Sequence, residues 1–444
     1  MKPASPFSLP NVRLFIIFRV LANARYYYPV MAKMFLDLGL TLTQFNLLNA
    51  IWAATIVLAE VPSGAMADIV GRRNLVLLAA LLMTVEMVVL LVAPIDGGWM
   101  LFTLVAINRI ASGLGEASAS GADEAVAFDT LQEKGLEAQW PRVLDILARW
   151  SAVGFFVAMI LGGLVYDLTL VNTVWQALGG SEELTRADIV KIPIWMTLIH
   201  ALVVALAALR MKEPESFERQ PMRWAAVRGA FQQMARAGQW TLQHRFVLFV
   251  IIAGVLLDAF GRQLAVLGSE YLSIIGYPPS MLGFIFAGLA LLGFFYGRIG
   301  RFLVTHRSPV QNLLLLSGCM LAGLLGLGFA LPYVGLLFYL LCTSALNFVG
   351  FFHSHYLNRE VDSKQRATVL SFKGLAINLG YGAIGLAHVA ILAGLQLWFP
   401  DASQDVLLTR SFFAFPVLFI LGLAVLLLAG RHFIRRQEKI TAVG

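Results

Sequence analysis

The chain has 444 residues, of which 59% are hydrophobic and only 13% are charged, whereas ordinary soluble domains have about 45–50% and about 25%. With a mean hydropathy of +0.77, this composition excludes the soluble, fibrous and disordered classes and indicates a polytopic membrane protein. The two cysteines, Cys319 and Cys342, lie in apolar runs, so no disulfide framework or metal cluster can be built from them.

Apolar segments long enough to cross a hydrocarbon core of about 30 Å recur along the whole chain. The first carries Arg19 and Arg25 and lacks a small-residue cleavage site, so we expect a retained span rather than a signal peptide. We predict twelve transmembrane helices. They cover residues 12–38, 44–66, 74–93, 99–128, 141–167, 189–210, 246–272, 279–300, 310–330, 333–357, 367–397 and 411–432.

The longest polar interruption separates the sixth predicted span from the seventh and contains alternating arginines and apolar residues. We therefore predict an all-α membrane protein with an N-terminal six-helix bundle (1–210), a cytoplasmic linker with an amphipathic helix (211–245) and a C-terminal six-helix bundle (246–444). A basic pair seven residues apart, Arg142 and Arg149, recurs as Arg366 and Lys373 at the start of the eleventh helix. This repetition favours two pseudo-symmetric halves, with a site at their interface near the bilayer midplane.

The basic residues give the orientation, because Lys and Arg accumulate in cytoplasmic loops. With both termini in the cytoplasm, only Arg186, Lys191 and Arg410 of the 33 basic residues fall in outside loops. The net charge of +7 is therefore explained by topology and by attraction to acidic lipid headgroups. A nucleic-acid partner is not expected.

Charged residues inside the spans are the strongest functional signal. A basic side chain facing lipid at the centre of a helix costs about 2.5–3.5 kcal/mol, so these residues must be paired or lie in water. Two pairs stand four residues apart on one helix and can close locally: Asp145 with Arg149 and Asp258 with Arg262. The basic residues within spans are Arg19, Arg25, Lys33, Arg109, Arg149, Arg262 and Lys373.

The fourth predicted span is the most polar. Arg109, Gly113, Glu116, Ser120 and Asp123 follow helical spacing and form an uninterrupted stripe on one face. We interpret this stripe as the wall of a water-filled cavity; a buried network that holds helices together is the alternative.

The first and eleventh spans are also polar inside. The predicted cavity and coupling residues are Arg19, Asn23, Arg109, Glu116, Arg149, Asp258, Arg262, Lys373 and Tyr381.

Between the second and third spans the chain reads EVPSGAMADIVGRR from Glu60 to Arg73. This segment closely resembles the loop signature of the major facilitator superfamily. The resemblance implies a conformational latch, in which the loop joins an acidic residue at the cytoplasmic end of the fourth helix and holds one state closed. The corresponding residues are Gly64, Asp68, Gly71, Arg72, Arg73 and, on the fourth helix, Asp129.

RIASGLG, from Arg109 to Gly115, resembles the second signature of the family, whose arginine is linked to proton coupling. The chain also resembles the bacterial branch near the drug:proton antiporters, which implies the bacterial cytoplasmic membrane and favours export. Ala158 and Met159 stand where that branch has Gly-Pro, which weakens the inference of export.

We therefore predict a proton-coupled secondary transporter of a small organic solute, monomeric and without a cofactor. Asp258 or Glu116 is expected to carry the proton, with Arg262 or Arg109 as its partner. The excess of basic residues keeps a second reading open, uptake of an anionic or zwitterionic metabolite by symport. A receptor or scaffold that does not transport is an alternative of another class, and an enzyme is not expected.

Overall fold

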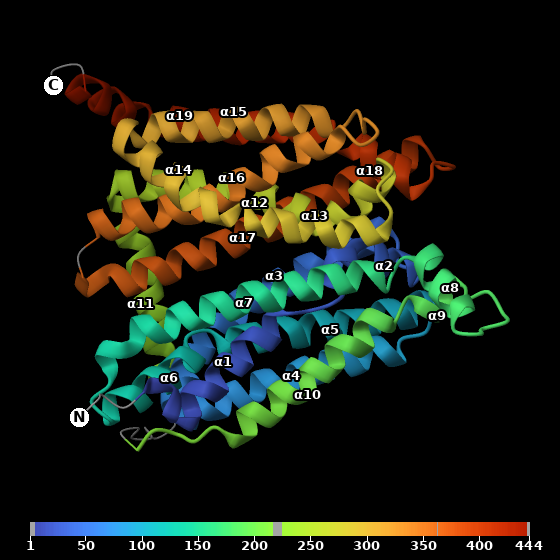
Figure 1. The fold of residues 1–444 in the computed structure, drawn as a ribbon. Coiled ribbons are helices and arrows are strands. Elements are labelled where there is room, and N and C mark those ends of the chain that lie inside the picture. Colours follow the sequence, from blue (N-terminus) through green and yellow to red (C-terminus); the bar gives the residue numbers. More distant parts are fainter. Residues whose placement is uncertain (1–4, 216–223, 362, 442–444) are drawn as a thin grey trace. The chain divides into compact units, whose positions relative to one another are not determined.

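The computed structural model describes residues 5–215, 224–361 and 363–441, and over these residues it contains helices and no strand (Figure 1). The first half contains η1 (Pro6–Ser8), α1 (Pro10–Asn23), η2 (Tyr28–Val30), α2 (Met31–Asp37), α3 (Leu42–Val70), α4 (Arg72–Val92), α5 (Gly98–Ala119), α6 (Ala122–Glu133), η3 (Glu137–Gln139), α7 (Trp140–Leu164), α8 (Leu168–Ala177), α9 (Arg186–Ile189) and α10 (Ile192–Arg210).

The segment predicted as a linker contains α11 (Trp224–Gln243). The second half contains α12 (Arg245–Ile274), α13 (Pro279–Leu291), α14 (Gly293–His306), α15 (Pro309–Leu327), α16 (Gly335–Glu360), α17 (Ser363–Trp398), α18 (Gln404–Ser411) and α19 (Ala414–Thr441). Local sequence begins several of them: α15 starts with a capping box of Ser308 and Gln311, and Asp167 caps α8 through the Leu170 N–H.

Within the described residues, 9 helices are long and apolar enough to cross a membrane, or up to 10 if the bent pair formed by α13 and α14 is one span. The two other predicted spans, 12–38 and 99–128, are interrupted. The first breaks after Asn23, where η2 and Pro29 intervene before α2. The other breaks between Ala119 and Ala122, where Gly121 has a positive φ of 74° and precedes α6.

The contacts divide the chain into two compact units. Unit 1 contains Met1–Leu40, Ala54–Ala230 and Pro278–Ala290, and unit 2 contains Thr41–Ala53, Phe231–Tyr277 and Leu291–Gly444. The first turns of α3 therefore belong to unit 2, whereas most of α13 belongs to unit 1.

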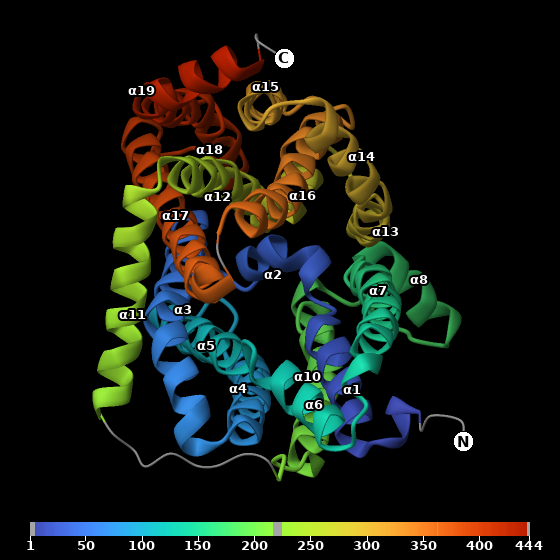
Figure 2. The same ribbon diagram turned by 90° about the vertical axis from the view of Figure 1, so that its left-hand side faces the viewer.

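In unit 1, α4 packs between α5 and α10, and α1 packs on α7 and α10; the ribbon in Figure 2 is seen along these helices. In unit 2, α12 is the central helix, in contact with α16, α17 and α19. Its interior face is almost completely buried, and it includes the polar residues Asp258, Gln263 and Glu270. A central helix with buried polar groups needs partners from the helices around it.

Candidate functional site

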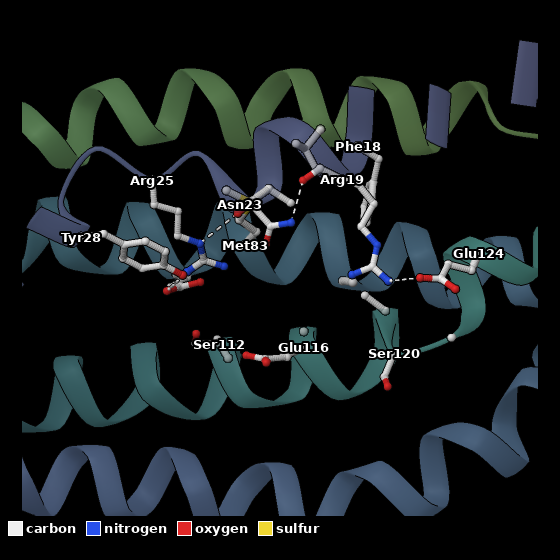
Figure 3. A pocket seen from close by; sticks show the side chains of 18 residues that line it. Phe18, Arg19, Asn23, Arg25, Tyr28, Met83, Ser112, Glu116, Ser120 and Glu124 are labelled. Carbon is white, nitrogen blue, oxygen red and sulfur yellow. Dashed lines mark hydrogen bonds and ion pairs between the residues drawn. The ribbon is translucent and has the colours of Figure 1, made fainter. Parts of the chain in front are cut away.

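Unit 1 contains a cavity of about 470 Å³. Figure 3 shows Arg19 and Arg25 on one side, and across from them Ser112 and Glu116 of α5 and Ser120 just beyond its end. Its lining residues are Phe18, Arg19, Ala22, Asn23, Arg25, Tyr28, Ala79, Met83, Glu86, Ala111, Ser112, Gly115, Glu116, Ala119, Ser120, Gly121, Glu124 and Val204.

An ionic cluster centred on Glu86 of α4 lies at one end of this cavity. Arg25 Nη1 is 2.7 Å from Glu86 Oε1, and the Tyr27 hydroxyl donates to the same oxygen over 3.1 Å. Arg25 also donates to the Tyr27 hydroxyl over 2.9 Å. The interrupted first span makes this possible, because Arg25 and Tyr27 lie in the turn between α1 and η2 rather than inside a helix.

Arg109 of α5 lies behind the cavity wall and is 5% exposed. Its Nη2 is 3.9 Å from Glu86 Oε1, its Nε donates to Asn108 Oδ1 over 2.9 Å, and its guanidinium lies 5.1 Å from the centre of the Phe35 ring. Asn108 in turn donates to the main-chain carbonyl of Glu86 over 2.8 Å. The fourth-span arginine is therefore held in a network with α4 and does not itself line the cavity.

A second cluster surrounds Arg19, at the junction of α5 and α6. Arg19 forms a close ion pair with the fully buried Asp123, and its Nη2 is 3.3 Å from Glu124 Oε1. Both acids lie in the first turn of α6, where the positive end of the helix dipole favours negative charge. The predicted stripe was wrong in one respect: it does not follow a single helix, because Gly121 separates Asp123 from Arg109 and Glu116.

In unit 2, the predicted pair of Asp258 and Arg262 forms along α12, with 2.9 Å between Arg262 Nη2 and Asp258 Oδ2. Arg262 also donates to Asn378 Oδ1 of α17 over 3.0 Å and lies over the Tyr381 ring at 5.5 Å. Trp52 meets the Tyr381 ring edge-on at 6.1 Å. Of the predicted residues, the structure thus brings Asp258, Arg262 and Tyr381 together.

Lys373 of α17 is half-buried and acts electrostatically on Asp258. Arg149 takes a different place: it pairs with Asp145 at 2.9 Å on α7, but its side chain is 72% exposed. It does not join the residues that line the cavity of unit 1.

Sequence reasoning missed a chain of neutral polar residues in unit 2. Gln263 donates to Asn46 Oδ1 and to His388 Nδ1, the latter over 3.1 Å. His388 Nε2 is 2.8 Å from Ser411 Oγ, and Ser411 donates to the Leu408 carbonyl over 2.6 Å. Ser411 therefore accepts from His388, which places the imidazole proton on Nε2. All four side chains are buried, and each is hydrogen-bonded to an uncharged partner.

In the loop signature, Arg72 pairs with Asp129, the acid that the resemblance assigned to it. Arg73 donates from Nη2 to the carbonyl of Leu209 at the end of α10. The side chain of Asp68 lies outside the described residues. A Cβ at Gly64 would meet no described atom within 4 Å, so no tight helix contact is seen there.

Glu213, which lies beyond the end of α10, contacts this loop and was not singled out from the sequence. Its carboxylate accepts from the N–H groups of Arg72 over 3.0 Å and Arg73 over 3.2 Å, at the positive end of α4. Gly71 has a φ of 99°, and a Cβ there would lie 2.5 Å from Glu213 Oε2. The positive φ at this position is the reason for glycine, and a Cβ would in addition displace the Glu213 carboxylate.

A signal for the missed Glu86 was present, since it is the single acidic residue within the third predicted span. Nothing in the sequence pairs it with Arg25, because η2, α2 and α3 lie between the two residues along the chain. Among the described residues, no group of three or more His, Cys, Asp or Glu side chains could hold a metal ion.

The comparisons with known proteins agree on the fold. Two solved structures resemble the chain at a TM-score of 0.68: the nucleoside transporter NupG (13% identity, 95% of this chain and 98% of that chain) and a bacterial homologue of the human lysosomal transporter Spinster, inward-facing and unoccupied (18%, 98% and 98%). The POT family transporter PepTSo resembles it at 0.64 (13%, 98% and 99%). At these identities the likeness shows the fold alone. No curated protein matches the sequence.

The family model described as Major Facilitator Superfamily matches residues 14–358. This range includes the loop signature, the arginine of the fourth span and the cavity of unit 1. The chain therefore belongs to the Major Facilitator Superfamily and has the fold of a multi-pass membrane transporter.

Proposed function

We propose that the protein is a secondary active transporter that moves a small organic solute across the bacterial cytoplasmic membrane by alternating access, coupled to protons and in the direction of export. The observation that carries this proposal is the cavity of about 470 Å³ in unit 1. Five charged side chains line it: Arg19, Arg25, Glu86, Glu116 and Glu124. Charged groups within membrane spans are costly, and in a transporter they mark the path of a solute or a proton.

Two carboxylates are our candidates for the proton carrier. Glu116 lies in the cavity wall, seven residues beyond Arg109 on the same helix. Asp258 pairs with Arg262 in unit 2. A neighbouring cation favours the ionised carboxylate and burial favours the protonated form, so movement of the partner between states would switch proton affinity.

The test is transport by purified protein in liposomes with an imposed proton gradient. Glu116→Gln and Asp258→Asn each keep the shape of the side chain and remove its charge. We expect at least one of them to lose gradient-driven transport while retaining the fold. Full gradient-driven transport by both variants would exclude both residues as the carrier.

A second candidate is uptake of an anionic or zwitterionic metabolite by proton symport. It is favoured by one observation, that two guanidinium groups share the single carboxylate of Glu86 at the cavity. Growth of a deletion strain on a panel of toxic compounds and nutrients separates the candidates. Hypersensitivity to toxic compounds supports export, and loss of growth on one nutrient supports uptake.

We further propose that the protein is a monomer with both termini in the cytoplasm. We also propose that the loop from Gly64 to Arg73 acts with Asp129 as the conformational latch. A membrane receptor or scaffold on the same fold is the alternative of another class. The same liposome experiment decides it, because a receptor would not move solute.

A further inference from the structure

The segment of unit 1 between α7 and α10 forms a hairpin, in which the loop after α8 folds back along the helix. Asn172 Nδ2 donates to the Leu184 carbonyl over 2.9 Å, and the Leu184 N–H donates back to Asn172 Oδ1 over 2.8 Å. The indole N–H of Trp175 donates to the Glu182 carbonyl over 3.0 Å. These bonds fix α8 and its loop relative to each other, and no residue of α8 lines the cavity of unit 1.

The exposed residues of α8 and its C-cap fall on two faces of different chemistry. Three large apolar side chains recur every four residues and are between 38% and 79% exposed: Leu170, Val174 and Leu178. We call these three residues the apolar row, and the exposed Trp175 lies next to it. The other exposed face is polar and consists of Thr169, Thr173 and Gln176. The hairpin is thus amphipathic, and its own loop leaves the apolar row uncovered.

The position of α8 places the apolar row at the edge of the bilayer. The candidate span that contains α7 ends at Leu164, and α8 begins four residues later at Leu168. Figure 1 shows α8 just beyond the end of α7. In Figure 2, α7 is seen nearly along its axis and α8 from the side, so α8 runs across the direction of the span. A helix in this position lies in the plane of the membrane interface, where its apolar face can enter the bilayer by about 5–10 Å.

Two further tryptophans mark the same level of unit 1. Trp99 and Trp195 lie in the first turns of α5 and α10 and are 78% and 57% exposed. Lys191, which precedes α10, donates to the Ala93 carbonyl just after α4, so α5 and α10 start at the same end of the unit. The hairpin joins α7 to α10 at this end. Exposed tryptophans gather where hydrocarbon meets headgroups, so Trp175 lies at the level of an aromatic belt.

The charges near α8 indicate the kind of lipid surface. α8 contains no charged residue, and the exposed charged residues of the loop that follows it are acidic, Glu182 and Glu183. Attraction to anionic lipids requires basic residues beside the apolar face. A zwitterionic surface, bound through apolar contacts, therefore fits this helix.

The apolar row is small for a protein partner. Three side chains and one indole on a helix of 10 residues offer far less area than the about 800 Å² per partner that a stable protein–protein interface buries. A lipid surface needs no such area, because the hairpin is already held by the spans on both sides.

We propose that α8 is an interfacial helix whose partner is a zwitterionic lipid surface. The apolar row lies among the upper parts of the acyl chains, Trp175 lies at the level of the headgroups, and the face with Thr173 lies in water. The orientation predicted from the basic residues assigns this surface to the outer leaflet. The inference goes beyond the proposed transport function and does not depend on it.

Spin labels on the full chain in phosphatidylcholine liposomes test the depth of each face. In a background with Cys319→Ala and Cys342→Ala, single cysteines for the label are introduced by Leu170→Cys and Val174→Cys on the apolar row. The matched control is Thr173→Cys, which is exposed on the polar face of the same helix. Collisions of the label with oxygen, which concentrates among acyl chains, are compared with collisions with a water-soluble nickel chelate.

We expect the ratio of oxygen to nickel collisions to be severalfold higher at the two row positions than at Thr173. Adding phosphatidylglycerol to the liposomes should leave these ratios unchanged, because α8 has no charge to respond to it. Equal ratios on the two faces would overturn the proposal. A difference that appears only with phosphatidylglycerol would overturn the zwitterionic assignment.

A second copy of the chain on the apolar row would give a different result. The spectra of the row labels would then broaden as the ratio of protein to lipid rises, and this too would overturn the proposal. A measurement without cysteine variants uses phospholipids brominated near the headgroup. They should quench the tryptophan fluorescence of the wild type more than that of Trp175→Phe, and equal quenching would contradict the proposed level of Trp175.

Discussion

The buried polar groups of the two units differ: those of unit 1 are mainly ion pairs, whereas unit 2 has, beside the ion pair of Asp258 and Arg262, a chain of neutral residues. In unit 1, the groups around the cavity are mostly ionised, with Arg19, Arg25 and Glu86 among them. In unit 2, the buried chain from Asn46 through Gln263 and His388 to Ser411 is neutral and completed by hydrogen bonds. A neutral chain can be satisfied in dry packing, whereas ionised groups need counter-charges and water. The difference favours the cavity of unit 1, rather than the neutral chain of unit 2, as the region that admits a polar solute.

The largest expected effect comes from breaking the ionic cluster of unit 1. Glu86→Gln leaves Arg25 and Arg109 buried with no carboxylate between them, and should cost about 3–5 kcal/mol of stability. Arg109→Gln leaves the closer Arg25 pair intact and should cost clearly less. Thermal unfolding in detergent measures both. Equal losses would mean that the guanidinium groups do not depend on Glu86.

Breaking the neutral chain of unit 2 should cost less stability than breaking the ionic cluster of unit 1. Gln263→Leu removes the amide that donates to both Asn46 Oδ1 and His388 Nδ1. It should cost about 1–3 kcal/mol, the penalty for one buried polar group left unpaired, because the two remaining atoms lie 3.3 Å apart and can pair with each other. The double variant with His388→Leu should lose less than the sum of the two single losses, because the partners act as a unit. Strict additivity would show that the chain is not cooperative.

A carboxylate of unit 1 that lies beyond the end of α7, Asp167, tests whether hydrogen bonds can replace a cation. Burial raises the pKa of Asp167, but hydrogen bonds from the Ser280 hydroxyl (2.6 Å), the Leu170 N–H (3.1 Å) and the Ser280 N–H (3.2 Å) outweigh it, and the pKa lies below its ordinary value.

Because the folded pKa is lowered, the ionised Asp167 contributes stability above its unfolded pKa, and this contribution is lost as the pH falls through the folded value. Ser280→Ala should cost about 1–2 kcal/mol at neutral pH. The difference from wild type should shrink in acid, below the ordinary pKa of aspartate. A difference that is constant with pH would contradict the assignment of the hydrogen bond to the ionised form.

The smallest effect on stability is expected at α7. Arg149 and Asp145 are 72% and 52% exposed, so Arg149→Gln should change stability by only about 0.5 kcal/mol or less. Transport by the same variant in liposomes tests the predicted coupling role of Arg149. Unchanged transport would remove it from the coupling residues.

The ion pairs of the site that lie within a single helix could be predicted from the sequence. Asp258 with Arg262 and Asp145 with Arg149 are fixed by spacings of four residues, and both pairs form. The role of Glu86 could not be predicted, since its partners come from the turn after α1 and from α5. The exposure of Arg149 could not be predicted either, because residue spacing shows which helix face a side chain lies on but not whether another helix covers that face.

Composition and periodicity by themselves determined that this is an all-helical membrane protein. Backbone N–H and C=O groups in lipid must be hydrogen-bonded within the protein, and apolar segments of this length meet that requirement as helices. The loop signature pointed to its family. Only the tertiary structure decided which charges neutralise one another, since that depends on distances between helices far apart in sequence. It also decided where the helices break: Gly121 takes a positive φ at a point where spacing alone predicted a continuous helix.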